Sequence, residues 1–266
     1  MKNILLPTDF SENSWNAIRY AIQFFNETSC NFYLLHVDDN LTRSLNKQNE
    51  TSTDKLNAFL TKITNNQKVK NHHFSTISEH HSFVESIRKQ VDENAIDYIV
   101  MGTKGASGIK KIILGSNTAD VITRVKCNTL IVPEKANYEE IKQVAFPTDY
   151  SVEYNLQVLQ PLSDILQKTK AGLNILHVSN ESEILNTNQI NNKSLLEEYF
   201  KHIKHKFHHI INKNIEETIE TFAECKDVNL IAMIAKNLNF FQQLFFRSKI
   251  KEVSFQTAIP FLVLHE

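Results

Sequence analysis

Residues Asp97–Ser116 read DYIVMGTKGASGIKKIILGS and contain four of the five glycines of this 266-residue chain. The apolar run Tyr98–Met101 comes directly before the first of these glycines, and a segment with helical spacing follows the last. Glycine tolerates positive φ angles and lets a ligand or another backbone approach closely. A strand, a glycine-rich turn and a helix in this order are typical of a phosphate site at a helix N-terminus.

Gly115-Ser116-Asn117-Thr118 is predicted to open that helix. The unpaired N–H groups and partial positive charge of a helix N-terminus attract an anion, and Ser116 can cap the helix or bond a phosphate oxygen. The alternative is that the glycines only form turns and that Ser116 is an ordinary N-cap. The spacing matches neither a Walker A loop nor a Rossmann fingerprint.

An internal repeat extends over the rest of the chain. Pro7-Thr8-Asp9-Phe10-Ser11 returns as Pro147-Thr148-Asp149-Tyr150-Ser151 at a shift of 140, and Leu34–Val37 returns as Ile175–Val178 at 141. Two later blocks align at a shift of 132, Asp97–Met101 with 229–233 and Thr129–Val132 with 261–264. The repeat predicts two domains, residues 1–136 and 137–266, with the second copy shorter in its middle.

Short apolar runs alternate with segments of helical period in both halves, with His73–Ile77 as a weaker fifth strand of the first half. Ser11 is the expected N-cap of the first helix, and Pro161 is expected to kink or restart its counterpart in the second half. Residues 40–55 are polar and predict a mobile surface loop. The fold class is therefore α/β, two tandem doubly wound domains, each a five-stranded mainly parallel sheet with helices on both faces and a ligand crevice beyond the carboxyl ends of its strands.

The second half has lost the glycines. At the shift of 132, Gly102 corresponds to Ile234 and Gly115 to Arg247, while phenylalanines crowd the segment at positions 240, 241, 245 and 246. Bulky side chains resist the conformations that glycine allows, so the second site is expected to be closed. A guanidinium at Arg247 that binds an anion is the alternative.

Composition excludes several classes of partner. With 29 Lys and Arg against 30 Asp and Glu, the chain has no electrostatic signature of a nucleic-acid or membrane binder. Three widely spaced cysteines fit a reducing compartment, and neither a signal-peptide core nor an apolar run of about 20 residues is found. The cytoplasm is the expected location.

The histidines invite a metal hypothesis, above all His202, His205 and His209, which would share a helical face. Flanking lysines repel a cation, so a solvated helix face is favoured over a metal site. His36 and His177 end equivalent strands, and their repetition favours a structural imidazole bonded to the backbone. No nucleophile with an adjacent base can be assigned, so no catalytic residue is predicted.

The spacing Gly102-x2-Gly105-x9-Gly115-Ser116 resembles the signature of the ATP-binding universal stress proteins, and the Pro-Thr-Asp start and the Leu-Leu-His-Val block resemble that family in both halves. The resemblance implies an adenine nucleotide alpha hydrolase-like fold that holds ATP, alone or with Mg²⁺. It implies that Asp9 contacts the adenosine part and that the backbone of Val37 contacts the adenine. It also implies that Met101–Gly105 line the loop and that Gly115, Ser116 and Asn117 hold the phosphates. The implied nucleotide-binding set is Pro7, Thr8, Asp9, Val37, Met101, Gly102, Lys104, Gly105, Gly108, Gly115, Ser116 and Asn117.

A nucleotide-dependent regulatory or stress-response module follows from this resemblance, with little or slow hydrolysis because no arginine finger or water-activating base is evident. The rival hypothesis is a nucleotide-free interaction scaffold of the same fold. In either case the two halves are expected to form an internal pseudo-dimer through their last strands, and a homodimer of the chain is possible on the same grounds.

Overall fold

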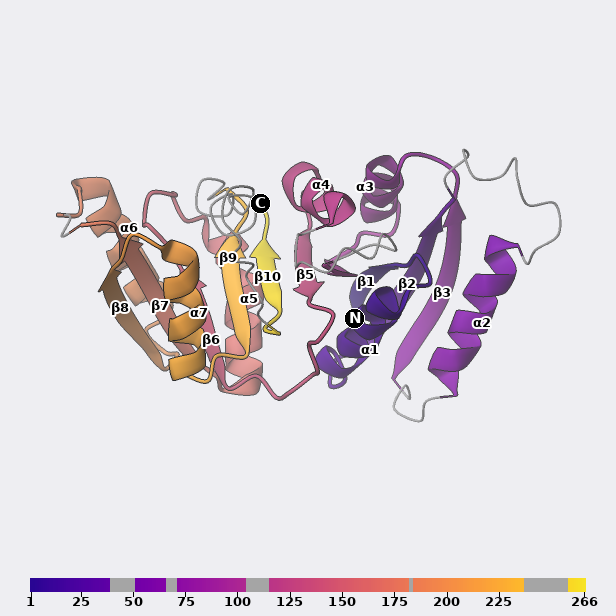
Figure 1. Cartoon of the computed structure of the whole chain (residues 1–266), viewed down its shortest axis with the longest axis horizontal. Helices are drawn as coiled ribbons and strands as arrows, with labels where there is room; N and C mark the ends of the chain where they lie inside the picture. Colours follow the sequence, from indigo (N-terminus) through magenta and orange to yellow (C-terminus); the bar gives the residue numbers. More distant parts are fainter. Residues whose placement is uncertain (39–50, 66–70, 104–114, 182–183, 237–257) are drawn as a thin grey trace. The chain divides into compact units, whose positions relative to one another are not determined.

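The computed structural model describes residues 1–38, 51–65, 71–103, 115–181, 184–236 and 258–266. The described residues up to Tyr138 form one compact unit, and those from Glu139 onward form a second. Strands and helices alternate along the first unit and along the described residues of the second as far as Ile234 (Figure 1).

The first unit holds β1 (Lys2–Pro7), α1 (Glu12–Phe24), β2 (Cys30–Val37), α2 (Ser52–Thr64), β3 (His72–Glu79), α3 (Phe83–Glu93), β4 (Tyr98–Gly102), α4 (Ser116–Arg124) and β5 (Asn128–Val132). Its strands are all parallel and lie in the order β3-β2-β1-β4-β5. The chain builds outward from β1 to β3 and then crosses to the other side of β1 with β4. This reversal is the topological switch point at which ligands bind in open α/β sheets.

The second unit repeats the plan with β6 (Gln143–Pro147), α5 (Leu156–Thr169), β7 (Gly172–Ser179), α6 (Thr187–Tyr199), β8 (His205–Ile211), α7 (Ile215–Cys225), β9 (Leu230–Ile234) and β10 (Phe261–Leu264). Its parallel strands lie in the order β10-β9-β6-β7-β8. The predicted fold class is therefore confirmed.

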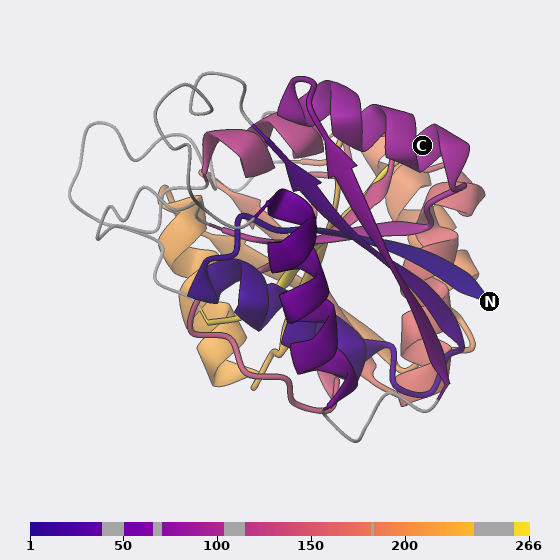
Figure 2. The ribbon, with the colours of Figure 1, turned by 90° about the vertical axis from the view of Figure 1, so that its right-hand side faces the viewer.

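Helices cover both faces of the first sheet (Figure 2). Because side chains alternate along a strand, Leu5, Leu35 and Ile99 point to one face, where they pack with residues of α3 and α4. Their neighbours Ile4 and Leu34 are also fully buried, on the face that α1 and α2 cover. Burial on both faces explains why these strands are continuous apolar runs.

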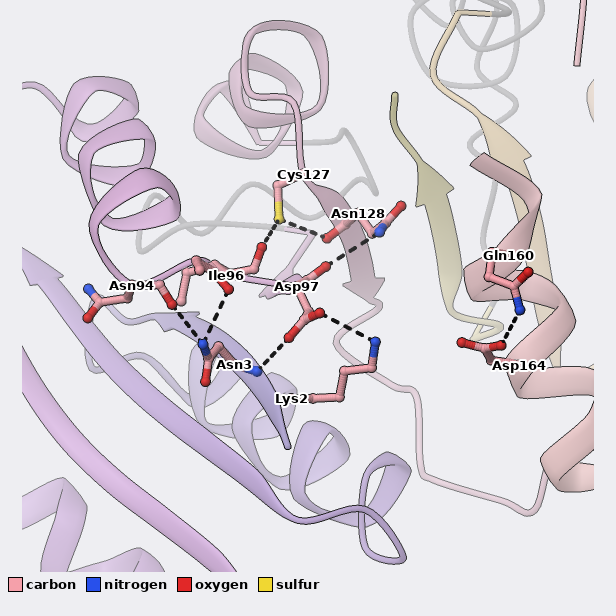
Figure 3. Close-up of polar contacts among 10 residues, drawn as sticks. Lys2, Asn3, Asn94, Ile96, Asp97, Cys127, Asn128, Gln160 and Asp164 are labelled. Carbon is pink, nitrogen blue, oxygen red and sulfur yellow. Dashed lines mark hydrogen bonds and ion pairs between the residues drawn. The ribbon is translucent and has the colours of Figure 1, made fainter. Parts of the chain in front are cut away.

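The amino ends of β1 and β4 are joined by Asp97 (Figure 3). Its carboxylate accepts a hydrogen bond from the backbone N–H of Asn3 at 2.8 Å and forms an ion pair with the ammonium group of Lys2 at 3.3 Å. In the second unit Asn229 takes the same place, and its side-chain oxygen accepts the backbone N–H of Gln143 at 3.2 Å. The same connection between the first and fourth strands is thus present in both units.

Three local features predicted from the sequence have different outcomes in the structure. Ser11 caps α1, as predicted, with its hydroxyl accepting the N–H of Ser14. Pro161 neither ends nor restarts α5, which is one helix with the proline inside it, because the buried Leu159 and Leu162 on either side keep it packed. The prediction of a loop over residues 40–55 is wrong from Ser52 onward, because α2 begins there. Thr51 and Asp54 form a capping box at its N-terminus.

Candidate functional site

A cavity of about 360 Å³ lies in the first unit, at the carboxyl ends of β1, β2 and β4 and beside the N-terminus of α4. It therefore occupies the switch point between β1 and β4, where the order of the strands reverses. Nine of the twelve residues predicted from the sequence line it: Pro7, Thr8, Asp9, Val37, Met101, Gly102, Gly115, Ser116 and Asn117. The other three, Lys104, Gly105 and Gly108, lie outside the described residues.

The turn after β1 is held by side chains that bond the backbone. The hydroxyl of Thr8 accepts the N–H of Phe10 at 3.0 Å and lies 3.0 Å from the hydroxyl of Ser14. Phe10 has a φ of 62°, so this bond holds an otherwise unfavourable conformation. The carboxylate of Asp9 accepts a hydrogen bond from the N–H of Ser11 at 3.1 Å. Because Asp9 is exposed, its side chain is accessible to a ligand.

His36 forms one wall of the cavity. Its Nδ1 lies 2.8 Å from the carbonyl oxygen of Thr8, which can only accept, so Nδ1 is the donor. Its Nε2 lies 3.3 Å from a carboxylate oxygen of Asp38. The predicted structural imidazole is confirmed here, and His177 repeats the contact with the carbonyl of Thr148 at 3.0 Å.

Gly102 ends β4 where another side chain approaches it closely. A Cβ atom at Gly102 would lie 2.3 Å from Nδ2 of Asn13, closer than any two such atoms pack. Asn13 lies in the first turn of α1 and is 8% exposed. The glycine is therefore needed to let α1 close the floor of the cavity.

The ends of the glycine-rich segment are tied together at the N-terminus of α4. The N–H of Gly115 donates to the carbonyl of Thr103 at 2.6 Å, and the hydroxyl of Thr118 donates to the carbonyl of Gly102 at 2.9 Å. Gly115, not Ser116, is the N-cap, and no side chain caps the helix. The first-turn N–H groups of α4, which have no partner within the helix, thus belong to residues that line the cavity.

Five lining residues stand outside the predicted binding set: Asn13, Ser14, Phe83, Thr118 and His36, the last of which was assigned a structural role. The first two follow the N-cap Ser11 by two and three positions, so the first turn of α1 was a signal that they face the strand ends. Thr118 lies in the first turn of α4 and could have been found in the same way. Phe83 begins α3, and its sequence gives no such signal.

The universal stress protein family model matches residues 1–133, half of the chain. This chain belongs to the universal stress protein family. Two curated relatives from Methanocaldococcus jannaschii are similar to it. Universal stress protein MJ0577 is 29% identical over 157 residues, which cover 50% of this chain and 96% of the relative. Universal stress protein MJ0531 is 28% identical over 139 residues, 49% of this chain and 81% of the relative.

A solved universal stress protein from Archaeoglobus fulgidus is similar over the whole length. The two structures have a TM-score of 0.70, with coverage of 98% of this chain and 97% of the other, at 21% sequence identity. A putative universal stress protein from Pseudomonas aeruginosa has a TM-score of 0.65 at 13% identity. At these identities the likeness shows the fold, and it extends over both units of this universal stress protein.

The second unit of this universal stress protein carries larger side chains at the corresponding strand ends. Tyr154 stands where the first unit has Ser14, and Ile234 stands where it has Gly102. The Tyr154 hydroxyl lies 2.5 Å from the Thr148 hydroxyl, only 5% of the residue is exposed, and burial raises the pKa of its phenol. The residues expected to fill the lost glycine loop, Phe240, Phe241, Phe245, Phe246 and Arg247, lie outside the described residues.

The prediction that His202, His205 and His209 share a helical face is wrong. Residues His205–Ile211 form strand β8, so His205 and His209 lie on one face of a strand and His208 on the other. The segment pairs with β7 in parallel from His205 to Ile211, and this pairing outweighs its weak helical period. Among the described residues, no group of three His, Cys, Asp or Glu side chains is placed to hold a metal ion.

No described helix of this universal stress protein is long and apolar enough to cross a bilayer.

Proposed function

We propose that this protein binds ATP, or a close adenine-nucleotide analogue, in the cavity of its first unit and acts as a nucleotide-dependent regulatory module in the cytoplasm. The observation that carries the proposal is the meeting of three elements in one cavity. The turn Pro7–Asp9, the end of β2 at Val37 and the uncapped N-terminus of α4 all line it.

The chemistry of these residues fits a nucleotide. The N–H groups at the start of α4 and the positive end of its dipole suit phosphate oxygens, and Gly115, Ser116 and Asn117 are the proposed phosphate contacts. The exposed carboxylate of Asp9 suits a ribose hydroxyl, and the backbone at Val37 suits the base. Lys104, Gly105 and Gly108 complete the proposed set on the strength of the family signature alone.

Slow or absent hydrolysis is part of the proposal. No arginine is found among the described lining residues, and the two ring nitrogens of His36 are already directed at Thr8 and Asp38. Rapid phosphoryl transfer needs a positioned water and a cation at the leaving oxygens. The described lining residues include no lysine or arginine that could supply such a cation, so they suit the binding of a nucleotide better than its rapid hydrolysis.

The division into a binding domain, 1–136, and a second domain without the glycine loop, 137–266, belongs to the same proposal. Tyr154 and Ile234 support it, because they replace a serine and a glycine of the first cavity. We expect one nucleotide per chain. The internal pairing of the two halves and a homodimer stay predictions.

Calorimetric titration with ATP tests the proposal in the full chain, in Gly115→Arg and in Gly115→Ala. Gly115 has a φ of −56° and a ψ of 146°, which any residue adopts, so alanine is a matched control that leaves the backbone intact. We expect saturable binding in the wild type and in Gly115→Ala, and its loss in Gly115→Arg. Absence of binding in the wild type would favour the nucleotide-free scaffold, and unchanged binding in Gly115→Arg would remove α4 from the site.

A further inference from the structure

The fifth glycine, Gly172, lies outside the glycine-rich segment and is the first residue of β7. It lines a second cavity, of about 300 Å³, in the second unit. This cavity lies at the amino ends of β7 and β8, the opposite end of the strands from the position that corresponds to the first site. Nothing in the proposed nucleotide function uses it.

Register places its residues on one sheet face. Gly172 pairs with Gln143 and lies beside Lys204, and the next inward-facing row holds Asn174 opposite Lys206. The C-terminal end of α7 closes the cavity with Lys226 and Asp227. Three exposed lysines and a single carboxylate, that of Asp227, therefore line one hollow, which gives its rim a net positive charge.

The three lysines are not neutralised by the protein. Within the described part of the chain, Lys204, Lys206 and Lys226 make no ion pair with a carboxylate, whereas Lys2 in the first unit is paired with Asp97. The positive charges of these lysines also affect a neighbouring side chain. The pKa of the nearby His208 is lowered, first by burial and then by the charges of Lys226 and Lys206.

A buried polar chain forms the floor. Asn174 is 6% exposed within a buried strand; its amide group donates to the side chain of Gln143 at 2.9 Å, and its oxygen lies 3.1 Å from Nε2 of His208. Buried polar side chains cost free energy and are kept where they are satisfied and useful. The first unit has Tyr33 at the equivalent position.

In the first unit, side chains that bond one another occupy the same place, among them Asn3, whose contacts with Asp97 and Asn94 are drawn in Figure 3. Asn31 stands where the second unit has Gly172, and its side chain donates to that of Asn3 at 2.8 Å. Asn3 in turn donates to the carbonyl of Asn94 at 2.8 Å. Because Gly172 has no side chain, the second unit has a cavity at the place that Asn3 and Asn31 fill in the first unit.

We propose that this cavity of the second unit is a binding site for a small phosphorylated molecule, held by Lys204, Lys206 and Lys226. Lysine ammonium groups serve as point charges for phosphate oxygens, and Asn174 and Gln143 supply a polar floor. Asp227 and the last carbonyls of α7 oppose an anion, and the three lysines outweigh them. The proposal does not depend on nucleotide binding by the first unit.

An NMR titration of the full, ¹⁵N-labelled chain with inorganic pyrophosphate tests it, because backbone amides report on the two cavities separately. We expect saturable shifts at Gly172, Lys204–Lys206 and Lys226 in the wild type. The variant Lys206→Gln/Lys226→Gln should bind about tenfold more weakly or worse, since two charge-assisted contacts are lost. The control Lys126→Gln/Lys213→Gln removes the same charge from exposed positions outside both cavities and should bind like the wild type.

Gly172→Asn installs the first-unit residue and fills the cavity without a change of charge. A Cβ there would lie 2.9 Å from Oε1 of Gln143, the atom that accepts from Asn174, so the Gln143 side chain must turn aside to make room. We expect the variant to stay folded and its pyrophosphate shifts to be lost. If it does not fold, the lysine double variant decides the test. The proposal would be overturned if the wild-type amides around Gly172 did not shift, or if the lysine double variant bound as tightly as its control. Shifts of the amides of Gly115–Thr118 report on the first cavity and do not affect this conclusion.

Discussion

Asn13 and Gly102 lie against each other on the floor of the first cavity, and their contact is a sharp test at the scale of single residues. Gly102→Ala would place a methyl group 2.3 Å from the Asn13 side chain. Overpacking of this kind costs about 1–3 kcal/mol of folding free energy. We expect urea unfolding of Gly102→Ala to show this loss, and Gly102→Ala/Asn13→Ala to be less impaired than the sum of its single variants. A Gly102→Ala protein as stable as the wild type would contradict the geometry.

Ser14 gives a second residue-scale test, because the repeat aligns it with a tyrosine, and both hydroxyls meet the hydroxyl of the preceding threonine, Thr8 or Thr148. Tyr154 is its counterpart and is buried against Thr148. We predict that Ser14→Tyr stays folded and binds ATP about tenfold more weakly or worse, since the ring takes space in the cavity.

The control for that substitution is Ser14→Ala, which removes the hydroxyl contact with Thr8 but leaves the space open. It should bind within a few fold of the wild type. Equal affinity in Ser14→Tyr and Ser14→Ala, read by calorimetry, would show that this position does not border the ligand.

The three cysteines are expected to differ sharply in reactivity. Cys225 is exposed, whereas Cys30 and Cys127 are buried. Burial, with a smaller effect of the Asp97 charge, raises the pKa of the Cys127 thiol to about 12, so its reactive thiolate is scarce at neutral pH. Titration with Ellman's reagent should find one fast thiol in the native protein, absent in Cys225→Ser, and three after denaturation. Two or more fast thiols in the native state would refute this assignment.

At the scale of elements, Glu79 joins the end of β3 to α3. Its carboxylate accepts from Lys89 and from Gln90, both at 2.8 Å. The Lys89 hydrogen bond is the main cause of the lowered pKa of Glu79. A lowered pKa means that the folded state binds fewer protons than the unfolded state, so the stabilisation is present above the ordinary glutamate pKa of about 4.3 and is lost as the pH falls below it.

The contribution of the Glu79–Lys89 pair to the free energy of unfolding can be measured by denaturant unfolding of the wild type and of Lys89→Met over a series of pH values. We predict that the difference in unfolding free energy between the two is largest near neutral pH and narrows as the pH falls from about 5 to 3. A difference that stays constant over that range would show that the pair does not link β3 to α3 energetically.

The elements also show how far sequence reasoning reached. The apolar runs ending at Pro7, Val37 and Gly102 predicted three buried parallel strands, because burial on both faces leaves a strong signal. Helix α2 was missed because its segment is polar and only one of its faces, with Leu56 and Ile63, is buried. Strand β8 was taken for a helix because an edge strand is half exposed and its histidines happen to recur at helical spacing.

At the scale of the whole molecule, the duplication was readable because buried strands and the Pro-Thr-Asp turn stay alike in both halves. The differences between the halves lie in side chains that no strand pattern constrains. Tyr154 in place of Ser14, and Gly172 in place of Asn31, change what each cavity can hold without changing the fold. The first cavity was therefore predictable from a motif, whereas the second needed the structure.

We propose one working nucleotide cavity per chain, at the carboxyl ends of the first unit's strands. The most direct test is the number of ATP molecules bound per chain at saturation, measured by equilibrium dialysis of the full-length protein. We predict one in the wild type and none in Gly115→Arg, and less than one in Ser14→Tyr at the ATP concentration that just saturates the wild type. Two nucleotides per chain, or one that persists in both variants, would contradict the central claim.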